Sequence, residues 1–121
     1  HVLYAAIDPG APATLSARVI DEIVRGAIGF DGVLISDDLS MGALTGSFAD
    51  RTSGALAAGC DVVLHCNGKM DEMQAIAAAA RPLHERALER LGCAAARKRK
   101  PAPVDRAGLA RQIERLLAAA V

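Results

Sequence analysis

The sequence predicts an α/β fold in which parallel strands alternate with helices. Residues 33–36 and 62–66 are short, continuously apolar runs, each of strand length. Runs that are apolar on both faces are typical of parallel strands buried between two layers. The segment between them, residues 47–58, is predicted to be a helix that ends at Gly59, where a glycine often follows the last helical turn.

The first thirty residues predict a strand end, a turn and a helix. Residues 2–7 are apolar and are expected to end a strand and run into a loop closed by Asp8-Pro9-Gly10. Either Thr14 or Ser16 is placed to cap the helix that follows. Apolar residues recur in this helix at helical spacing until Gly29, namely at Val19, Ile20, Ile23, Val24 and Ala27.

The remaining sequence predicts three more helices. Two of them cover about residues 71–80 and 83–98, with Pro82 between them. Pro101-Ala102-Pro103 is expected to be a linker, and Asp105 to cap a last amphipathic helix. The apolar stripe of that helix consists of Leu109, Ile113, Leu116 and Leu117.

Two strands and a fragment of a third do not close a sheet by themselves. A complete TIM barrel of eight β/α units takes about 250 residues, whereas this chain has 121. The sequence therefore predicts part of a (β/α)8 barrel. Residues 1–100 are assigned to its β/α units, and residues 101–121 to a linker and a C-terminal helix.

Composition narrows the classes of function. Lys+Arg and Asp+Glu number 14 each, and this balance is unlike the basic surface of a nucleic-acid-binding domain. The run at residues 97–100 is either a patch for an anionic surface or a solvated helix end. Three cysteines without a C-x-x-C pair predict neither a disulfide framework nor a zinc site, which fits a reducing cytoplasm. No apolar run reaches transmembrane length.

Polar residues follow both predicted strands. In parallel β/α folds functional side chains gather at the C-terminal ends of strands, which here carry Ser36-Asp37-Asp38 and His65-Cys66-Asn67. Because side chains alternate along a strand, only one of the two aspartates points into the mouth with Val33 and Ile35. This parity favours Asp37 and leaves Asp38 as a helix cap or loop anchor.

The segment from Gly29 to Met41, Gly-Phe-Asp-Gly-Val-Leu-Ile-Ser-Asp-Asp-Leu-Ser-Met, resembles the nucleophile segment of family 3 glycoside hydrolases. Within that family it resembles the bacterial β-N-acetylglucosaminidases that recycle cell-wall fragments. The stretches at residues 1–4, 8–16 and 57–67 are similar to the same family in the expected order. The resemblance covers residues 1–80 well and implies that the chain is the C-terminal portion of the catalytic barrel.

The resemblance also implies a function. Asp37 corresponds to the nucleophile of a retaining mechanism that removes terminal β-linked N-acetylglucosamine from muropeptides or similar saccharides, without metal or organic cofactor. His1 aligns with a histidine at the mouth of the preceding strand, where a binding role and a structural role remain alternatives. Met41 follows Asp37 closely enough to line the pocket. The acid–base loop of the family, with its Asp-His pair, is expected upstream of His1.

Alternatives remain at this point. His65 is either a packed, hydrogen-bonded core histidine or, with Asn67, a residue of the mouth. A receiver domain that is phosphorylated on Asp37 would need a lysine at the next strand end, where His65-Cys66-Asn67 stands instead. The other hypothesis is a non-catalytic barrel fragment with a structural or interaction role, since the acid–base motif is not in these 121 residues. We expect the chain alone to be inactive.

Overall fold

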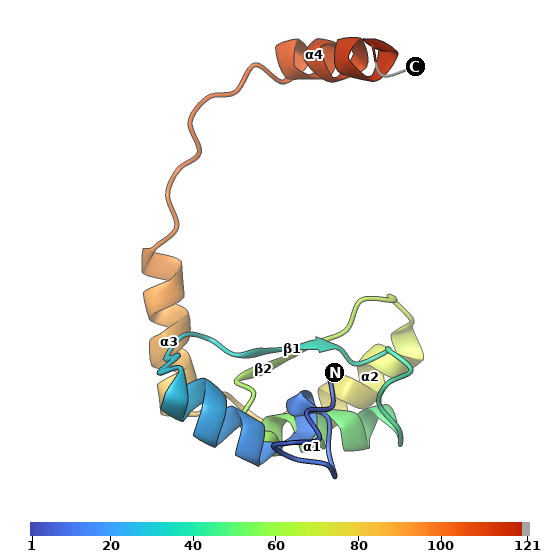
Figure 1. Cartoon of the computed structure of the whole chain (residues 1–121), viewed down its shortest axis with the longest axis vertical. Helices are drawn as coiled ribbons and strands as arrows, with labels where there is room; N and C mark the ends of the chain where they lie inside the picture. The colour runs from blue at the N-terminus through green and yellow to red at the C-terminus, as the bar shows by residue number, and fades with distance from the viewer. Residues whose placement is uncertain (120–121) are drawn as a thin grey trace.

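The computed structural model describes residues 1–119 and contains a central β-α-β unit. A 3-10 turn, η1 (Ala13–Leu15), and a π-helix, η2 (Val19–Ala27), precede this unit. It consists of β1 (Ile35–Asp38), α1 (Phe48–Ala58) and β2 (Val62–Leu64). The helices α2 (Met70–Ala79), α3 (Glu85–Ala96) and α4 (Arg106–Ala119) follow. The two strands are parallel neighbours, as the sequence predicts (Figure 1).

The core of the protein lies between the strands and the helices on one side of them. Helix α1 packs against α2, β2 and η1, and the three helical elements lie on the same side of the sheet (Figure 1). One apolar cluster is built around Ile20, Ala55, Ala58 and Cys60, and a second around Leu39, Leu44 and Ile76. The second cluster consists of three large aliphatic residues, whereas the first combines one, Ile20, with three small side chains.

The other face of the sheet is uncovered in this chain. Val63 packs against the core clusters, whereas its neighbour Leu64 is 41% exposed. On β1, Ser36 is buried and Ile35 is 55% exposed, so the two strands turn apolar side chains away from the helices. Apolar side chains on a parallel sheet are normally buried on both faces. This face therefore has the character of an interior surface.

The predicted bounds of the first strand are wrong by two residues, because the strand is β1 at Ile35–Asp38 and not 33–36. The N–H of Leu34 donates to the Asp61 side chain at 2.8 Å instead of joining the strand ladder. Beyond Ser36 the pairing continues, and the N–H of Leu39 reaches the carbonyl of Leu64 at 2.9 Å. Asp37 and Asp38 are therefore the last two residues of the strand and do not lie beyond it.

Two other predicted segments also differ. Residues 2–7 form no strand; instead the N–H groups of Ile7 and Asp8 both bond to the carbonyl of Tyr4, which makes a turn. The second strand ends at Leu64 and not at Cys66, because the Cys66 N–H donates to the Asp38 carboxylate at 3.2 Å. Side-chain acceptors thus replace main-chain partners at both strand ends.

The helix predicted after Ser16 is present but is π-wound, since the N–H of Ile28 bonds to the carbonyl of Ile23, five residues earlier. Arg25 donates to the carbonyls of Phe30 and Gly32, which hold the departing chain against the helix and accompany this wider turn. Ser16 is the cap, as its hydroxyl oxygen accepts from the Val19 N–H at 3.1 Å.

Helix α1 begins and ends as predicted. Ser47 and Asp50 form a reciprocal capping box at its start. Gly59 follows its end with φ +115°, and a Cβ there would lie 2.9 Å from Ile20 Cγ2. Both the backbone conformation and the close contact with η2 therefore require glycine at position 59.

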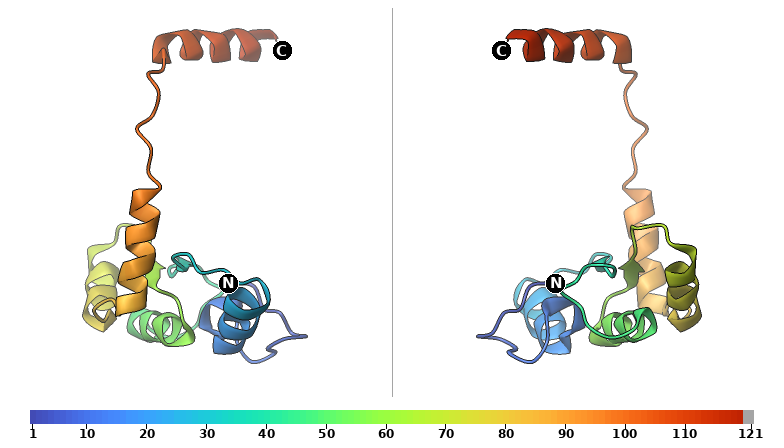
Figure 2. Two further views of the ribbon diagram at one scale, coloured as in Figure 1. Left: turned by 90° about the vertical axis from the view of Figure 1, so that its left-hand side faces the viewer. Right: turned by 90° about the vertical axis from the view of Figure 1, so that its right-hand side faces the viewer.

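Helix α4 stands away from the rest of the chain, at the end of an extended segment (Figure 2). Asp105 caps it by accepting from the Gly108 N–H at 2.9 Å, as predicted. The residues of its apolar stripe are at least half exposed; they are Leu109, Ile113, Leu116 and Leu117. Among residues 1–119, no helix combines the length and the apolarity that crossing a membrane requires.

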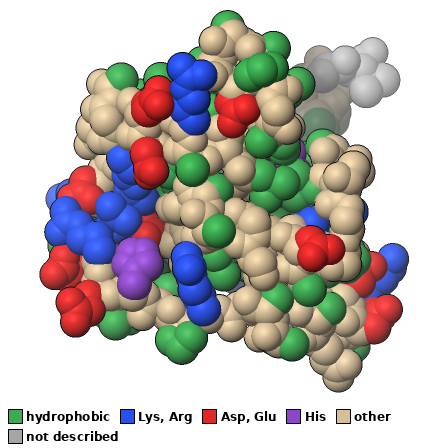
Figure 3. All heavy atoms as spheres, turned by 90° about the horizontal axis from the view of Figure 1, so that it is seen from below, with side chains coloured by type: hydrophobic (Ala, Val, Ile, Leu, Met, Phe, Trp, Pro, Cys, Tyr) green, Lys and Arg blue, Asp and Glu red, His purple; other side chains and the backbone are tan. Residues whose placement is uncertain are grey.

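Helix α3 is held to the body largely by charge. It begins at Glu85, because the ring of His84 accepts from the Ala87 N–H as the N-cap. Arg90 pairs with the buried Asp61 at 2.9 Å and also with Asp31. Seen from below the view of Figure 1, basic and acidic side chains gather on one side of the molecule with a histidine among them (Figure 3).

Asp61 is the centre of this charged network, and its side chain is completely buried. It also accepts from Arg25 at 2.9 Å, so it joins η2, the start of β1 and α3. Burial alone raises the pKa of Asp61, but the Leu34 N–H and the guanidinium groups of Arg90 and Arg25 outweigh it and bring the pKa below its ordinary value.

We predict that Asp61→Asn lowers the free energy of unfolding of the chain by about 3 kcal/mol, because it leaves two guanidinium groups without their buried partner. Since the folded pKa of Asp61 is lowered, its contribution is present above the carboxyl's ordinary pKa and is lost as pH falls. Urea unfolding followed by circular dichroism measures the change. The control is Asp71→Asn, on the exposed first turn of α2; equal midpoints for the two variants would contradict the prediction.

Candidate active site

Asp37 lies at the C-terminal end of β1 with its side chain on the uncovered face of the sheet. The residue is exposed, between buried Ser36 and half-buried Asp38. Its Oδ1 accepts a hydrogen bond from the Asp38 backbone N–H at 2.8 Å. The Ser36 hydroxyl donates to the Asp37 carbonyl at 2.7 Å and accepts from the Leu64 N–H at 3.0 Å, which links β1 to β2 beside Asp37. The backbone of Asp37 is therefore held while its carboxylate faces outward.

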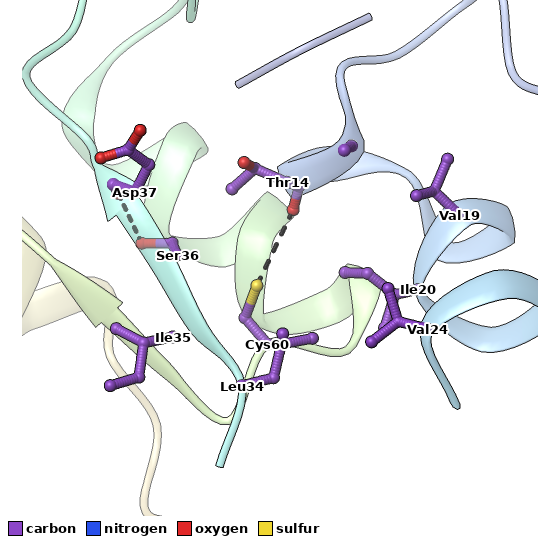
Figure 4. Close-up of a pocket in the computed structure, with 10 residues that line it drawn as sticks. Thr14, Val19, Ile20, Val24, Leu34, Ile35, Ser36, Asp37 and Cys60 are labelled. Atoms are coloured by element: carbon purple, nitrogen blue, oxygen red, sulfur yellow. Dashed lines mark hydrogen bonds between the residues drawn. The ribbon is translucent and has the colours of Figure 1, made fainter. Parts of the chain in front are cut away.

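A cavity of about 140 Å³ lies between β1 and η2, with Asp37 in its lining (Figure 4). Its walls are largely apolar and come from Val19, Ile20, Val24 and Leu34. Cys60 lies in it, and its Sγ is 4.0 Å from the Thr14 carbonyl. Burial raises the pKa of the Cys60 thiol to about 11, so this cysteine is kept in its unreactive thiol form.

Asp38 is fully engaged in tying two loops together. Its carboxylate accepts from the Ser40 hydroxyl at 2.6 Å, the Ser40 N–H at 3.0 Å and the Cys66 N–H at 3.2 Å. The hydrogen bond from the Ser40 hydroxyl is the largest cause that lowers the pKa of Asp38 from its ordinary value. Asp38 thus anchors the β1–α1 loop to the segment after β2, which is one of the two roles that strand parity leaves to it, whereas Asp37 is exposed.

His1 lies beside the end of β1 and is held by two hydrogen bonds. Its Nε2 is 2.8 Å from the Asp38 carbonyl oxygen and its Nδ1 is 2.8 Å from the Thr14 hydroxyl. Since a carbonyl only accepts, Nε2 must donate, and the Nδ1 of the neutral ring accepts from Thr14. Both ring nitrogens of His1 thus serve to join the N-terminal segment to the strand that carries Asp37.

The backbone of Met41 also bonds to the Asp38 carbonyl, as His1 does. Its N–H donates to the Asp38 carbonyl oxygen at 3.1 Å, while its side chain is 43% exposed. Arg51 of α1 donates to the carbonyl of Leu39 at 2.7 Å and lies over the Phe48 ring at 5.0 Å. The sequence did not single out Arg51, although it fixes the loop in which Met41 lies.

His65 and Asn67 end the second strand segment. The amide of Asn67 donates to Glu72 at 2.6 Å and its carbonyl accepts from the Lys69 N–H, which makes it a residue of the loop turn. The His65 side chain is 7% exposed and lies between Asp38 and Glu72. Of the two alternatives for His65, the packed one agrees with this burial, but among residues 1–119 neither ring nitrogen has a partner in hydrogen-bonding geometry.

Asp61 and Glu72 were not among the residues that sequence reasoning selected. An aspartate that directly precedes an apolar strand, as in Cys60-Asp61-Val62, is the signal that could have indicated a buried charge. Glu72 carries no such signal, because a carboxylate in the first turn of a helix is ordinary. Within residues 1–119, no group of three or more His, Cys, Asp and Glu side chains is arranged to hold a metal ion.

Comparison with known proteins identifies the family to which the chain belongs. Residues 1–97 match the model described as the glycosyl hydrolase family 3 N terminal domain. The chain belongs to glycoside hydrolase family 3. A β-hexosaminidase of Pseudomonas aeruginosa strain LESB58 is 49% identical over 80 residues, which are 64% of this chain and 24% of that protein. A β-hexosaminidase of Chromobacterium violaceum is 46% identical over 93 residues, or 75% of this chain and 26% of that protein.

A solved structure is similar to this family member in fold. It is a family 3 β-N-acetylglucosaminidase from Paenibacillus sp. str. FPU-7, with a TM-score of 0.61 and 29% identity over 86% of this chain and 23% of that one. The two parallel strands and their helices thus match part of a family 3 barrel domain. The chain spans about a quarter of the length of these curated relatives.

For this family member we predict that the tether between Asp38 and Cys66 survives well into the acid range. Because the pKa of Asp38 is lowered in the folded state, the tether is present above the ordinary carboxyl pKa of about 4 and is lost only as pH falls through the lower value. The Cys66 amide signal in an acid NMR titration reports this loss. In Asp38→Asn that titration step should vanish, and an unchanged step would assign it to another group.

Proposed function

We propose that this chain is the C-terminal portion of a family 3 (β/α)8 barrel and that Asp37 is its catalytic nucleophile. The reaction is the retaining hydrolysis of a terminal β-linked N-acetylglucosamine, as in muropeptide recycling. The observation that carries the proposal is the contrast between the two adjacent carboxylates. Asp38 accepts three hydrogen bonds from two loops, whereas Asp37 is exposed at a strand's C-terminal end, where barrel enzymes hold their reacting groups.

The proposed chemistry proceeds in two displacements. A carboxylate oxygen of Asp37 attacks the anomeric carbon, the glycosidic C–O bond breaks, and the leaving oxygen takes a proton from a general acid. Water then attacks the anomeric carbon of the glycosyl ester, and the Asp37 carboxylate is released. This attack requires a carboxylate in a fixed position. The Ser36 hydroxyl, which joins the Asp37 carbonyl to the Leu64 N–H of β2, holds the Asp37 backbone in place.

The relatives support the substrate class. The similar proteins of known description are β-hexosaminidases and a β-N-acetylglucosaminidase. His1 and Met41 are proposed to border the sugar, since both are bonded to the Asp38 carbonyl beside Asp37. We assign the proton donor to the part of the relatives that this chain does not span. The receiver hypothesis gains no support from these comparisons.

The decisive test is a chimera in which the 80 matching residues of this chain replace those of the Pseudomonas aeruginosa relative. We predict that Asp37→Ala in the chimera lowers kcat by about 10⁴-fold or more, as loss of a nucleophile does elsewhere. Turnover of an aryl N-acetylglucosaminide measures it. Asp38→Ala should lower the thermal transition and reduce kcat much less than Asp37→Ala does.

A covalent label provides a second measurement on the same chimera. A slow fluorinated glycoside should accumulate as a glycosyl ester, and peptide mass mapping should find it on Asp37. A label on Asp38 or outside the segment 35–38 would refute the assignment. A fully active Asp37→Ala chimera would instead favour the alternative, a non-catalytic fragment with a structural role.

We predict that the 121-residue chain alone gives no turnover above blank. Without a positioned general acid it forgoes a contribution of about 10²–10⁴-fold, in addition to the residues that hold the substrate. The same aryl glycoside assay measures this, with the unmodified P. aeruginosa relative as the positive control. Measurable turnover that Asp37→Ala abolishes would show that a residue of this chain donates the proton.

A further inference from the structure

The imidazole of His65 is buried between two carboxylates that come from different elements. Its Nδ1 is 3.7 Å from Asp38 Oδ1 at the end of β1, and its Nε2 is 3.2 Å from Glu72 Oε2 in the first turn of α2. The His65 side chain is 7% exposed, and within residues 1–119 neither nitrogen makes a hydrogen bond. Each nitrogen therefore has a carboxylate oxygen as its nearest charged neighbour, although neither contact has hydrogen-bonding geometry.

The number of N–H groups on the ring decides how many of the two carboxylates can receive a donor. A neutral imidazole has a single N–H, so one of its nitrogens would turn a lone pair toward a carboxylate. The doubly protonated ring has an N–H for each of the two carboxylates. The pKa values of both Asp38 and Glu72 are lowered, chiefly by hydrogen bonds from Ser40 and Asn67, so both carboxylates are charged at neutral pH.

The surroundings of His65 hold it in this position. The edge of the ring meets the Phe48 ring of α1 at 5.3 Å and 73°. Arg51 lies on Phe48, and Lys69 pairs with Glu72 at 3.2 Å. The charged groups around the site from β1, α1, α2 and the β2–α2 loop are thus Asp38, Arg51, Glu72 and Lys69.

Asp38 connects the His65 ring to the Asp37 carboxylate. Asp38, which faces the His65 ring, donates its backbone N–H to Asp37 Oδ1 at 2.8 Å. We propose that the protonated His65 bridges Asp38 and Glu72 and thereby acts as a positioning residue for the Asp37 carboxylate. It ties the β1–α1 loop to the start of α2. Its relevance to catalysis rests on the proposed function, whereas the bridge itself does not.

The test uses the full chain labelled with ¹⁵N and ¹³C and measures no turnover, so its outcome is independent of the chimera. In the wild type, a pH titration should move the Asp38 amide signal together with the His65 ring signals. In His65→Gln this step should disappear, and the Asp38 and Cys66 amides should shift. The matched control is His84→Gln, because His84 lies beside Asp61 at the other end of the strands; it should leave both amides in place.

Thermal unfolding provides a second readout. His65→Gln and Glu72→Gln should each lower Tm by several degrees, and the double variant by no more than the larger single effect, because both remove the same bridge. Additive losses would overturn the proposal. So would an Asp38 amide that does not follow the His65 ring in the wild type, and this measurement decides the matter even where His65→Gln fails to fold.

Discussion

The buried carboxylate of Asp61 joins three separate segments of this chain, and the position of both strands depends on it. It accepts from the Leu34 N–H where β1 would otherwise begin, from Arg25 of η2 and from Arg90 of α3. Removing water from such a charge is costly, and only several donors together offset that cost. Arg25 in turn binds two carbonyls of the chain that enters β1. The start of the sheet is thus set by a charge and not by the strand ladder.

Asp38 joins the two strand segments at the C-terminal end of the sheet, as Asp61 joins them at its start. Each aspartate lies at an end of a strand and accepts an N–H from the neighbouring strand segment, Cys66 in one case and Leu34 in the other. The core between them relies in part on small residues such as Ala55 and Ala58. Small side chains bury little apolar area, and two strands pair over only a few residues. Polar side-chain bridges therefore contribute more to the placement of the two strands here than they would in a protein with a large core.

Sequence patterns predicted what depends on local chemistry. The glycine after α1 and the parallel β-α-β order follow from residue types and spacing. Strand parity indicated that Asp37 and Asp38 face different surroundings. The strand bounds were wrong because Asp61 and Asp38, both distant in sequence, replace main-chain acceptors. The π-winding of η2 and the bridge at His65 also arise from tertiary contacts, which periodicity does not contain.

The candidate nucleophile is distinguished by what surrounds it more than by its own contacts. At the end of β1 the hydroxyl of Ser36, the carboxylate of Asp38 and the ring of His1 are each engaged in holding chain segments together. Among residues 1–119, the Asp37 carboxylate accepts only from the N–H of its neighbour, and it faces the uncovered side of the sheet. A residue kept solely for structure would gain stability from further partners at this position. Three anchored neighbours surround an exposed carboxylate that one backbone N–H holds on a strand end, and this combination of a fixed position and a free side chain is what the proposed nucleophile requires.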